Sequence, residues 1–187
     1  AASDVYKRQA LGCIPTTKSL DDLFRVKKRS RLLPVSLGVT DLSQASEIVE
    51  IPDDVPEILK SFPEGSLSIV LKANEKMDER LGGFRVAVRV VTHPVARDLL
   101  GKTGPLTATS ANLSGEEPEL DCLSAAESLS TPEFPIIAVE GVCGGGLPST
   151  LIAWHTVCDS PESMRIEVIR EGKIGSEEIY SWWRKRI

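Results

Sequence analysis

The sequence predicts an α/β domain built on a twisted sheet that mixes parallel and antiparallel strands. Short strand-like and helix-like segments alternate along the 187 residues, which is typical of α/β proteins. Some strand-like segments follow one another without an intervening helix, and this favours a mixed sheet over a purely parallel one. No shift in composition marks a second domain, so we expect a single domain over residues 10–187.

The first part of the chain is expected to alternate helices with strands. Ser19 can cap the first helix, because Asp22 follows three residues later and an apolar face begins there. Pro52 separates two short helices, since proline breaks a helix interior. The expected elements are a helix from residue 19, a strand at 34–39, helices at 43–50 and 53–60, and a strand at 67–71.

The clearest strand pattern in the chain, at residues 85–91, has valine at every second position. These valines would face one side of the sheet and Arg89 the other. The next helix is expected to begin at Pro94, after a cap at Thr92 or His93. It should end before Gly101. The strands expected from here on are at residues 85–91, 106–109, 135–139, 150–154 and 165–169, and the helices are at 123–129 and from 176 onward.

Composition excludes several classes of protein. The net charge of −5 argues against a surface coated in positive charge for tight, non-specific nucleic-acid binding. No run approaches the roughly 18 apolar residues of a membrane span. The four cysteines form no C-x-x-C pair, so we expect reduced, mostly buried thiols in a cytosolic protein, not a zinc site. With two histidines in the chain, a Ser-His-Asp hydrolase is not expected.

The most informative segment is Gly-Pro-Leu-Thr-Ala-Thr-Ser-Ala-Asn-Leu-Ser-Gly at residues 104–115. A short apolar strand ends here in Ser110, Asn112, Ser114 and a glycine. Short hydroxyl and amide side chains, together with backbone N–H groups, suit anions and polar ligands. The alternative is an ordinary Asn/Ser/Gly turn without a ligand.

Positive charge is concentrated at residues 25–31, where five of seven residues are basic. Such a cluster can hold phosphate, with Lys as a point charge and Arg through two parallel hydrogen bonds. A solvated face, or a complement to the end of the preceding helix, would explain the same pattern. Arg89 poses a similar choice, because an Arg within an apolar strand pairs with an internal carboxylate or with an anionic ligand.

A second loop, Gly-Gly-Gly-Leu-Pro-Ser-Thr at residues 144–150, precedes an expected strand. Glycine lets a backbone approach a ligand closely. Neither G-x-x-x-x-G-K-[ST] nor G-x-G-x-x-G occurs in the chain, so a nucleotide would be held in some other way. We expect His93 to cap a helix or lie on the surface, with catalysis as the less favoured alternative.

Taken in order, these segments resemble the YrdC-like family of threonylcarbamoyl-AMP synthases. The resemblance covers residues 10 to 175, and S-A-N-x-S-G is its most specific single motif. The matching segments are K-K-R-S-R-L-L-P at 27–34, G-S-L-S-I-V-L at 65–71, V-R-V at 88–90 followed by H-P at 93–94, T-S-A-N-L-S-G at 109–115, L-P-S-T-L at 147–151 and I-R-E-G at 169–172.

The resemblance implies an enzyme with a twisted mixed sheet and a concave, positively charged cleft. Its reaction converts L-threonine, bicarbonate (or CO2) and ATP with Mg2+ into threonylcarbamoyl-AMP and pyrophosphate. A partner threonylcarbamoyl transferase then uses the product to make N6-threonylcarbamoyladenosine in tRNA. The implied location is the cytoplasm, with no membrane contact and with tRNA as a further candidate partner.

The resemblance also implies roles for individual residues. The ATP-binding set is Lys27, Arg29, Arg31, Asn112, Ser114 and Arg170, and the threonine-binding set is Arg89, Ser110 and Ser149. No residue is given a catalytic role of its own, and no metal site on the protein is implied. Attack of a carbamate oxygen on the α-phosphorus needs positioning and charge stabilisation more than an acid–base pair.

The N-terminal end departs from the family pattern. Residues 1–9 have neither signal-peptide nor strand character, and we expect them to be a non-native or scrambled segment outside the domain. The family's early P-T-E-T-x-Y-G-L-G strand, whose hydroxyls help to hold threonine, is represented only by Ala-Leu-Gly-Cys at 10–13. We therefore expect this chain to bind threonine poorly or to be inactive.

Two other functions fit part of the sequence. The basic cluster at 25–31 would suit a module that binds tRNA or double-stranded RNA without catalysis, although few aromatic residues are present for stacking. Steep salt dependence without ATP turnover would favour that alternative. A carbamoyl-transfer domain, as found in hydrogenase-maturation proteins, is the third choice, because the accompanying zinc-finger and acylphosphatase-like motifs are absent from the sequence.

Overall fold

Seven strands form one sheet in the order β1-β5-β2-β4-β3-β6-β7 in a computed structural model that describes residues 9–116, 119, 121–139, 147–155 and 165–186. The strands are β1 (Ala10–Leu11), β2 (Ser36–Val39), β3 (Leu67–Lys72), β4 (Arg85–Val90), β5 (Leu106–Ser110), β6 (Thr150–Trp154) and β7 (Ile166–Arg170). The pairs β2–β4 and β3–β6 are parallel, and the other four pairs are antiparallel. The predicted mixed sheet is therefore confirmed.

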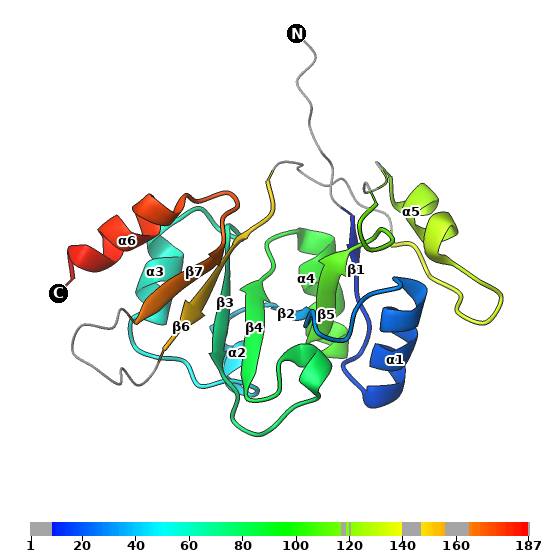
Figure 1. Ribbon diagram of the computed structural model, residues 1–187, viewed down its shortest axis with the longest axis horizontal. Helices are drawn as coiled ribbons and strands as arrows, with labels where there is room; N and C mark the ends of the chain where they lie inside the picture. The colour runs from blue at the N-terminus through cyan, green and yellow to red at the C-terminus, as the bar shows by residue number, and fades with distance from the viewer. Residues whose placement is uncertain (1–8, 117–118, 120, 140–146, 156–164, 187) are drawn as a thin grey trace, which may run out of the picture.

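The helices pack around this sheet. They are α1 (Thr17–Val26), α2 (Leu42–Ser46), α3 (Val55–Ser61), the 3-10 turn η1 (Glu79–Leu81), α4 (Pro94–Thr103), α5 (Cys122–Leu129) and α6 (Ser176–Arg184). In Figure 1, α2, α3 and α4 lie behind the strands, α1 and α5 flank the β1–β5 end, and α6 lies beside β7. None of the helices in the described part of the chain is long and apolar enough to cross a membrane.

The main core forms where the apolar faces of these elements meet. Val86 and Val88 of β4 are buried, as the alternation predicts, whereas most of β3 is buried on both faces. The apolar residues of both strands belong to the same core as the apolar face of α1. Burial of such side chains is the main favourable term in folding. A smaller cluster, formed by Ala111, Ala125 and Leu129, joins the end of β5 to α5.

Several expected helix boundaries are wrong by a few residues. Thr16, not Ser19, caps α1, because its side chain accepts a hydrogen bond from the backbone N–H of Ser19. The helix expected at 43–50 ends at Ser46, and Val49 instead pairs as a β-bridge with Ala73. The helix expected at 53–60 is α3. Gly101 lies inside α4, which ends at Thr103.

The strand expected at residues 135–139 is wrong. This stretch has no regular secondary structure and joins none of the ladders of the described sheet. Ile137 is 88% exposed, whereas Ile136 packs against the smaller cluster around Ala111. Alternation of apolar residues cannot make a strand without a partner strand to accept its hydrogen bonds.

Hydrogen bonding between the N-terminal segment and the rest of the domain is seen from Gln9 onward. Ala111 donates a backbone hydrogen bond to the carbonyl oxygen of Gln9, and Ala10 pairs with Ser110 in the β1–β5 ladder. Of residues 1–9, the predicted non-native segment, residues 1–8 lie outside the described residues. Residues 9–11 thus place the first strand, β1, directly against the S-A-N motif.

Candidate functional site

Arg89 lies on β4 and reaches toward the loop that precedes β3. Its Nη2 donates to the carbonyl oxygen of Gly65 at 3.0 Å, and its Nε is buried with no hydrogen-bond partner in the described part of the chain. Burial, together with the nearby charge of Arg170, lowers the pKa of Arg89. No described carboxylate contacts this guanidinium, so the internal ion pair considered above is not seen among residues 9–116, 119, 121–139, 147–155 and 165–186.

Ser149 lies at the start of β6 and connects two strands through its polar atoms. Its hydroxyl is 2.7 Å from the hydroxyl of Ser68 on β3, and both residues are buried. Its carbonyl oxygen accepts a hydrogen bond from Nη2 of Arg170 at 3.0 Å. The register agrees with this contact, because Leu151 of β6 pairs with Arg170 of β7.

Thr150 holds the turn after β7 against β6. Its side-chain oxygen donates to the carbonyl of Ile174 at 2.6 Å and accepts from the backbone N–H groups of Gly172 and Ile174 at 3.0 and 2.9 Å. The residue is fully buried. A Cβ on Gly172 would lie 2.1 Å from the carbonyl oxygen of Pro148, so this close approach requires glycine.

The basic cluster begins where α1 ends, as predicted. Lys27 is only 1% exposed, and its ammonium donates to the carbonyl oxygens of Ser110 and Asn112. Burial, and to a lesser extent the charge of Arg29, lowers the pKa of Lys27 to about 8. Lys28 has a positive φ of 49°, and it turns the backbone away from the helix.

Arg29 connects the cluster to the arginines of the sheet. It donates to the carbonyls of Leu33 and Pro34 at 2.7 and 3.0 Å. Burial and the charge of Arg170 lower its pKa. Since Arg170 acts on Arg29 and Arg89, and Arg29 acts on Lys27, the four residues form a chain of neighbouring positive charges. Such mutual repulsion is relieved when an anion binds between the cations.

The S-A-N-x-S-G loop is held by hydrogen bonds to its own backbone and to α1. Asn112 donates through Nδ2 to the carbonyls of Leu113 and Glu116, and its Oδ1 is buried with no partner among the described residues. The backbone N–H of Ser114 donates to the carbonyl of Lys27 at 3.0 Å. A buried acceptor without a donor costs free energy until a ligand or water supplies one.

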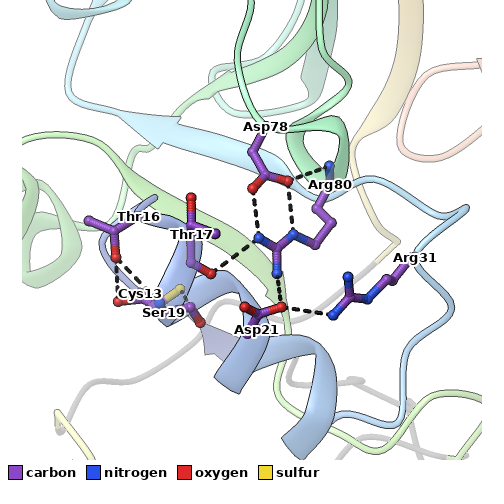
Figure 2. Close-up of polar contacts among 8 residues, drawn as sticks. All are labelled: Cys13, Thr16, Thr17, Ser19, Asp21, Arg31, Asp78 and Arg80. Carbon is purple, nitrogen blue, oxygen red and sulfur yellow. Dashed lines mark hydrogen bonds and ion pairs between the residues drawn. The ribbon is translucent and has the colours of Figure 1, made fainter.

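Arg31 lies apart from the chain of charges. It pairs with Asp21 at 2.8 Å, and its side chain is 73% exposed. Figure 2 shows that the same carboxylate also pairs with Arg80, whose guanidinium is held on its other side by both oxygens of Asp78. This network joins α1 to η1, and an open hollow of ≈ 420 Å³ lies beside it, lined by Arg31 and residues 76–80.

Some predictions fall elsewhere or outside the described residues. Gly144–Gly146 of the second glycine loop lie outside the described residues. His93 is the N-cap residue of α4, but its side chain makes no capping hydrogen bond. Cys13 and Cys122 are free thiols. No three His, Cys, Asp or Glu side chains of the described residues are close enough to hold a metal ion. The concave basic cleft stays a prediction.

Sequence reasoning missed the residues that support the site from behind. Ser68, Thr150 and Arg80 are all buried, and no contact was predicted for any of them from the sequence. Ser66, whose hydroxyl is buried without a partner in the described structure, was also missed. The spacing of Ser66 and Ser68 on one side of β3 was a signal, but its meaning depends on β4 and β6 being the neighbouring strands.

Comparison with known proteins finds relatives along most of the chain. The threonylcarbamoyl-AMP synthase of Hydrogenovibrio crunogenus is 34% identical over 137 residues, covering 69% of this chain and 71% of that protein. A protein of Mycobacterium tuberculosis is 31% identical over 160 residues, covering 84% of this chain and 70% of the relative.

Solved structures share the fold. A crystal structure of P. abyssi Sua5 complexed with L-threonine matches with a TM-score of 0.77 at 24% identity, over 95% of this chain and 51% of that chain. This chain therefore spans about half the length of that Sua5 protein. E. coli YciO matches with a TM-score of 0.69 at 25% identity, over 90% of this chain and 82% of that chain.

Residues 9–172 match the sequence pattern of the Sua5/YciO/YrdC family, whose description reads "Telomere recombination". The matched range contains the S-A-N-x-S-G loop and every arginine of the chain of charges. It ends directly after Arg170 and the glycine at 172. On the family match and on the identity to its curated relatives, this chain belongs to the Sua5/YciO/YrdC family.

Proposed function

We propose that this protein makes threonylcarbamoyl-AMP from L-threonine, bicarbonate or CO2, and ATP, with release of pyrophosphate. The product would serve the N6-threonylcarbamoylation of adenosine in tRNA, carried out by a partner transferase in the cytoplasm. Membership of a family that includes threonylcarbamoyl-AMP synthases supports this proposal. The neighbouring positive charges of Arg29, Arg170 and Arg89 are the observation that carries it.

Arg89 is the proposed ligand of the threonine carboxylate. Its Nε is a buried donor without a partner in the described structure. Ser149 lies just before β6, on the far side of β3 from β4, and its hydroxyl is bonded to Ser68 of β3. A carboxylate binds an arginine through two parallel hydrogen bonds, one of which needs this kind of free donor. Ser110, at the end of β5, is the third proposed threonine contact.

Arg29 and Arg170 are the proposed ligands of the ATP phosphates. Their charges act on each other, so a polyanion that binds between them removes a repulsion present in the ligand-free protein. Ser114 and Asn112 are proposed to contact the nucleotide by hydrogen bonds. Arg31 would have to leave Asp21 to take part, since that ion pair occupies its guanidinium.

Mg2+ is proposed to arrive with ATP, held by phosphate oxygens and water, which are the ligands it prefers in nucleotide complexes. It would neutralise charge on the phosphates during phosphoryl transfer. No metal site on the protein is proposed.

The chemistry requires positioning more than proton transfer. The threonine amine and bicarbonate form a carbamate with loss of water. One carbamate oxygen then attacks the α-phosphorus, and the bond from that phosphorus to the bridging oxygen of the β-phosphate breaks. Pyrophosphate leaves with the electron pair. Fixed cations around the transferring group stabilise the charge that develops, and this accounts for a site without a histidine base.

The test is pyrophosphate release from ATP with Mg2+ and bicarbonate, measured with and without L-threonine. We expect release that depends on threonine and that falls by at least about a hundredfold in Arg89→Ala, the cost of losing a bidentate contact to a charged group. Arg85→Ala is the matched control, because Arg85 is on the same strand but at its other end, near His155.

Other outcomes would identify the alternatives. Turnover with carbamoyl phosphate, but not with bicarbonate and threonine, would identify the carbamoyl-transfer function. Steeply salt-dependent tRNA binding without ATP turnover would identify the RNA-binding module. Calorimetric titration with ATP separates an inactive synthase, which binds the nucleotide, from a protein of different function, which does not.

A further inference from the structure

The buried side chain of Lys27 is the feature of the basic cluster that phosphate binding leaves unexplained. A phosphate ligand needs an accessible ammonium, but Lys27 is 1% exposed and its ammonium is already bonded to the carbonyl oxygens of Ser110 and Asn112. These two carbonyls lie on either side of Ala111. The ammonium therefore lies beneath the S-A-N turn.

The backbone of the same residue makes a further contact with this loop. The carbonyl oxygen of Lys27 accepts a hydrogen bond from the N–H of Ser114 at 3.0 Å. Three hydrogen bonds thus join one residue at the end of α1 to the last residue of β5 and to two positions of the loop that follows it. The C-cap of α1 is Lys27 itself, and its backbone N–H is bonded back to Leu23 and Arg25, which fixes the clamp to the helix.

Apolar packing strengthens the same junction. Val26 and Leu113 pack against the small cluster of Ala111, Ala125 and Leu129. On the far side, the N–H of Ala111 donates to the carbonyl of Gln9. The turn is therefore held from α1, from α5 and from the segment that leads into β1.

We propose that Lys27 is a positioning residue, which fixes the shape of the S-A-N-x-S-G loop for both substrates and does not itself bind ATP. This inference rests on the proposed function for the identity of the substrates, but not for the clamp. An ammonium buried under carbonyls keeps the loop in one conformation because charge-assisted hydrogen bonds are roughly twice as strong as neutral ones. The lowered pKa of the lysine is the expected result of this burial.

The experiment compares Lys27→Met with Lys28→Met. The second variant removes the same charge one residue further on, from an exposed position. Calorimetry measures the dissociation constant of L-threonine in the absence of nucleotide, and separately that of ATP with Mg2+. If Lys27 shapes the loop, Lys27→Met weakens threonine binding at least about tenfold, the equivalent of one lost charge-assisted hydrogen bond, and Lys28→Met does not.

Threonine without nucleotide carries no phosphate, so this measurement distinguishes the two roles. The proposal would be overturned if Lys27→Met weakened only the binding of ATP and bound threonine as well as Lys28→Met does. Lys27 would then be a phosphate ligand. Lys27→Arg retains a cation with several N–H donors, and we expect it to restore most of the threonine affinity.

Native-state hydrogen exchange tests the clamp without any ligand. We expect the amides of Ala111 and Ser114 to exchange at least about tenfold faster in Lys27→Met, with the amides of β3 and β4 unchanged as the measure of global opening. Equal exchange in both Met variants would overturn the proposal. If the wild-type protein binds neither threonine nor ATP, the proposed function fails, and the exchange result still decides the role of Lys27.

Discussion

Arg170 donates a hydrogen bond to the backbone carbonyl of Ser149, and this contact sets a cation from the end of β7 directly over the start of β6. The hydroxyl of Ser149 is in turn bonded to Ser68. One serine thus fixes the place of a phosphate-binding candidate through its backbone and is itself a proposed threonine contact through its side chain. The two proposed subsites share this residue, so changes near it should affect both substrates.

Gly172→Ala should displace this arrangement. The new Cβ would lie 2.1 Å from the carbonyl oxygen of Pro148, and the backbone of Ser149 is also within 3 Å. We expect a loss of about 2–4 kcal/mol in the free energy of unfolding and a weaker affinity for ATP, because the turn must move away from β6. Urea denaturation and calorimetry measure the two effects.

Gly101→Ala is the matched control for that change. No atom lies within 4 Å of a Cβ at this helical position. Alanine there should stabilise the protein by about 0.5–1 kcal/mol. A Gly172→Ala variant as stable as the wild type would contradict the close approach seen here.

Arg89→Met should weaken threonine binding and stabilise the folded protein. Burial and the charge of Arg170 both disfavour the guanidinium in the ligand-free protein, so its removal should raise the melting temperature by about 2–4 °C at low salt. The gain should shrink as salt screens the repulsion. Scanning calorimetry at two ionic strengths measures it, and Arg85→Met should show no such gain.

Arg80→Met should be the most destabilising change in the network of Figure 2. The guanidinium is 7% exposed and pairs with Asp78 and Asp21 at 2.6 Å each. Removing it leaves Asp78 without its counter-charge and Asp21 with only the exposed Arg31, at a cost of about 3 kcal/mol. Arg31→Gln removes the exposed pair to the same Asp21 and should cost less than about 1 kcal/mol. Equal losses in the two variants would show that burial is not what distinguishes these pairs.

The lowered pKa of Lys27 predicts how stability changes in alkali. Its folded value of about 8 lies below the ordinary value of 10.5, so between these two pH values the unfolded chain binds more protons than the folded protein. The free energy of unfolding should therefore rise as pH increases from 8 toward 10.5. Lys27→Met should lack this rise, and chemical denaturation at several pH values measures the difference between the two proteins.

Most strands could be predicted because the apolar pattern of a strand lies within a few consecutive residues of the sequence. The alternation at residues 85–91 and the run at 150–154 each match an observed strand to within a residue. The stretch at 135–139 has a similar apolar content, but its strand would need a neighbour that the described residues do not supply. Helix starts were harder to predict, because Thr16 and Ser19 both carry a hydroxyl that could cap the helix. Only the backbone conformation shows that Thr16 is the N-cap residue.

Candidate site residues could be chosen from the sequence, but their contacts could not. Arg89 stood out because it interrupts an apolar strand, and Lys27 because it belongs to a basic cluster. Their partners, Gly65 and the carbonyls of Ser110 and Asn112, depend on which strands are neighbours. The pairing of Arg31 with Asp21 could not be predicted for the same reason. Asp21 also pairs with the buried Arg80, which comes from a distant segment of the chain.

The non-sequential order of the strands has a consequence for how this protein acquires its activity. Ser68 and Ser149 are 81 residues apart in the chain, and Lys27 and Ser110 are 83 residues apart. Contacts between such distant residues form slowly, because closing large loops costs entropy before the contacts can compensate. Neither the N-terminal half nor the C-terminal half of the chain contains both members of either pair. Recovery of ligand binding should therefore coincide with the last kinetic phase of refolding, and it should lag behind the recovery of helical circular dichroism.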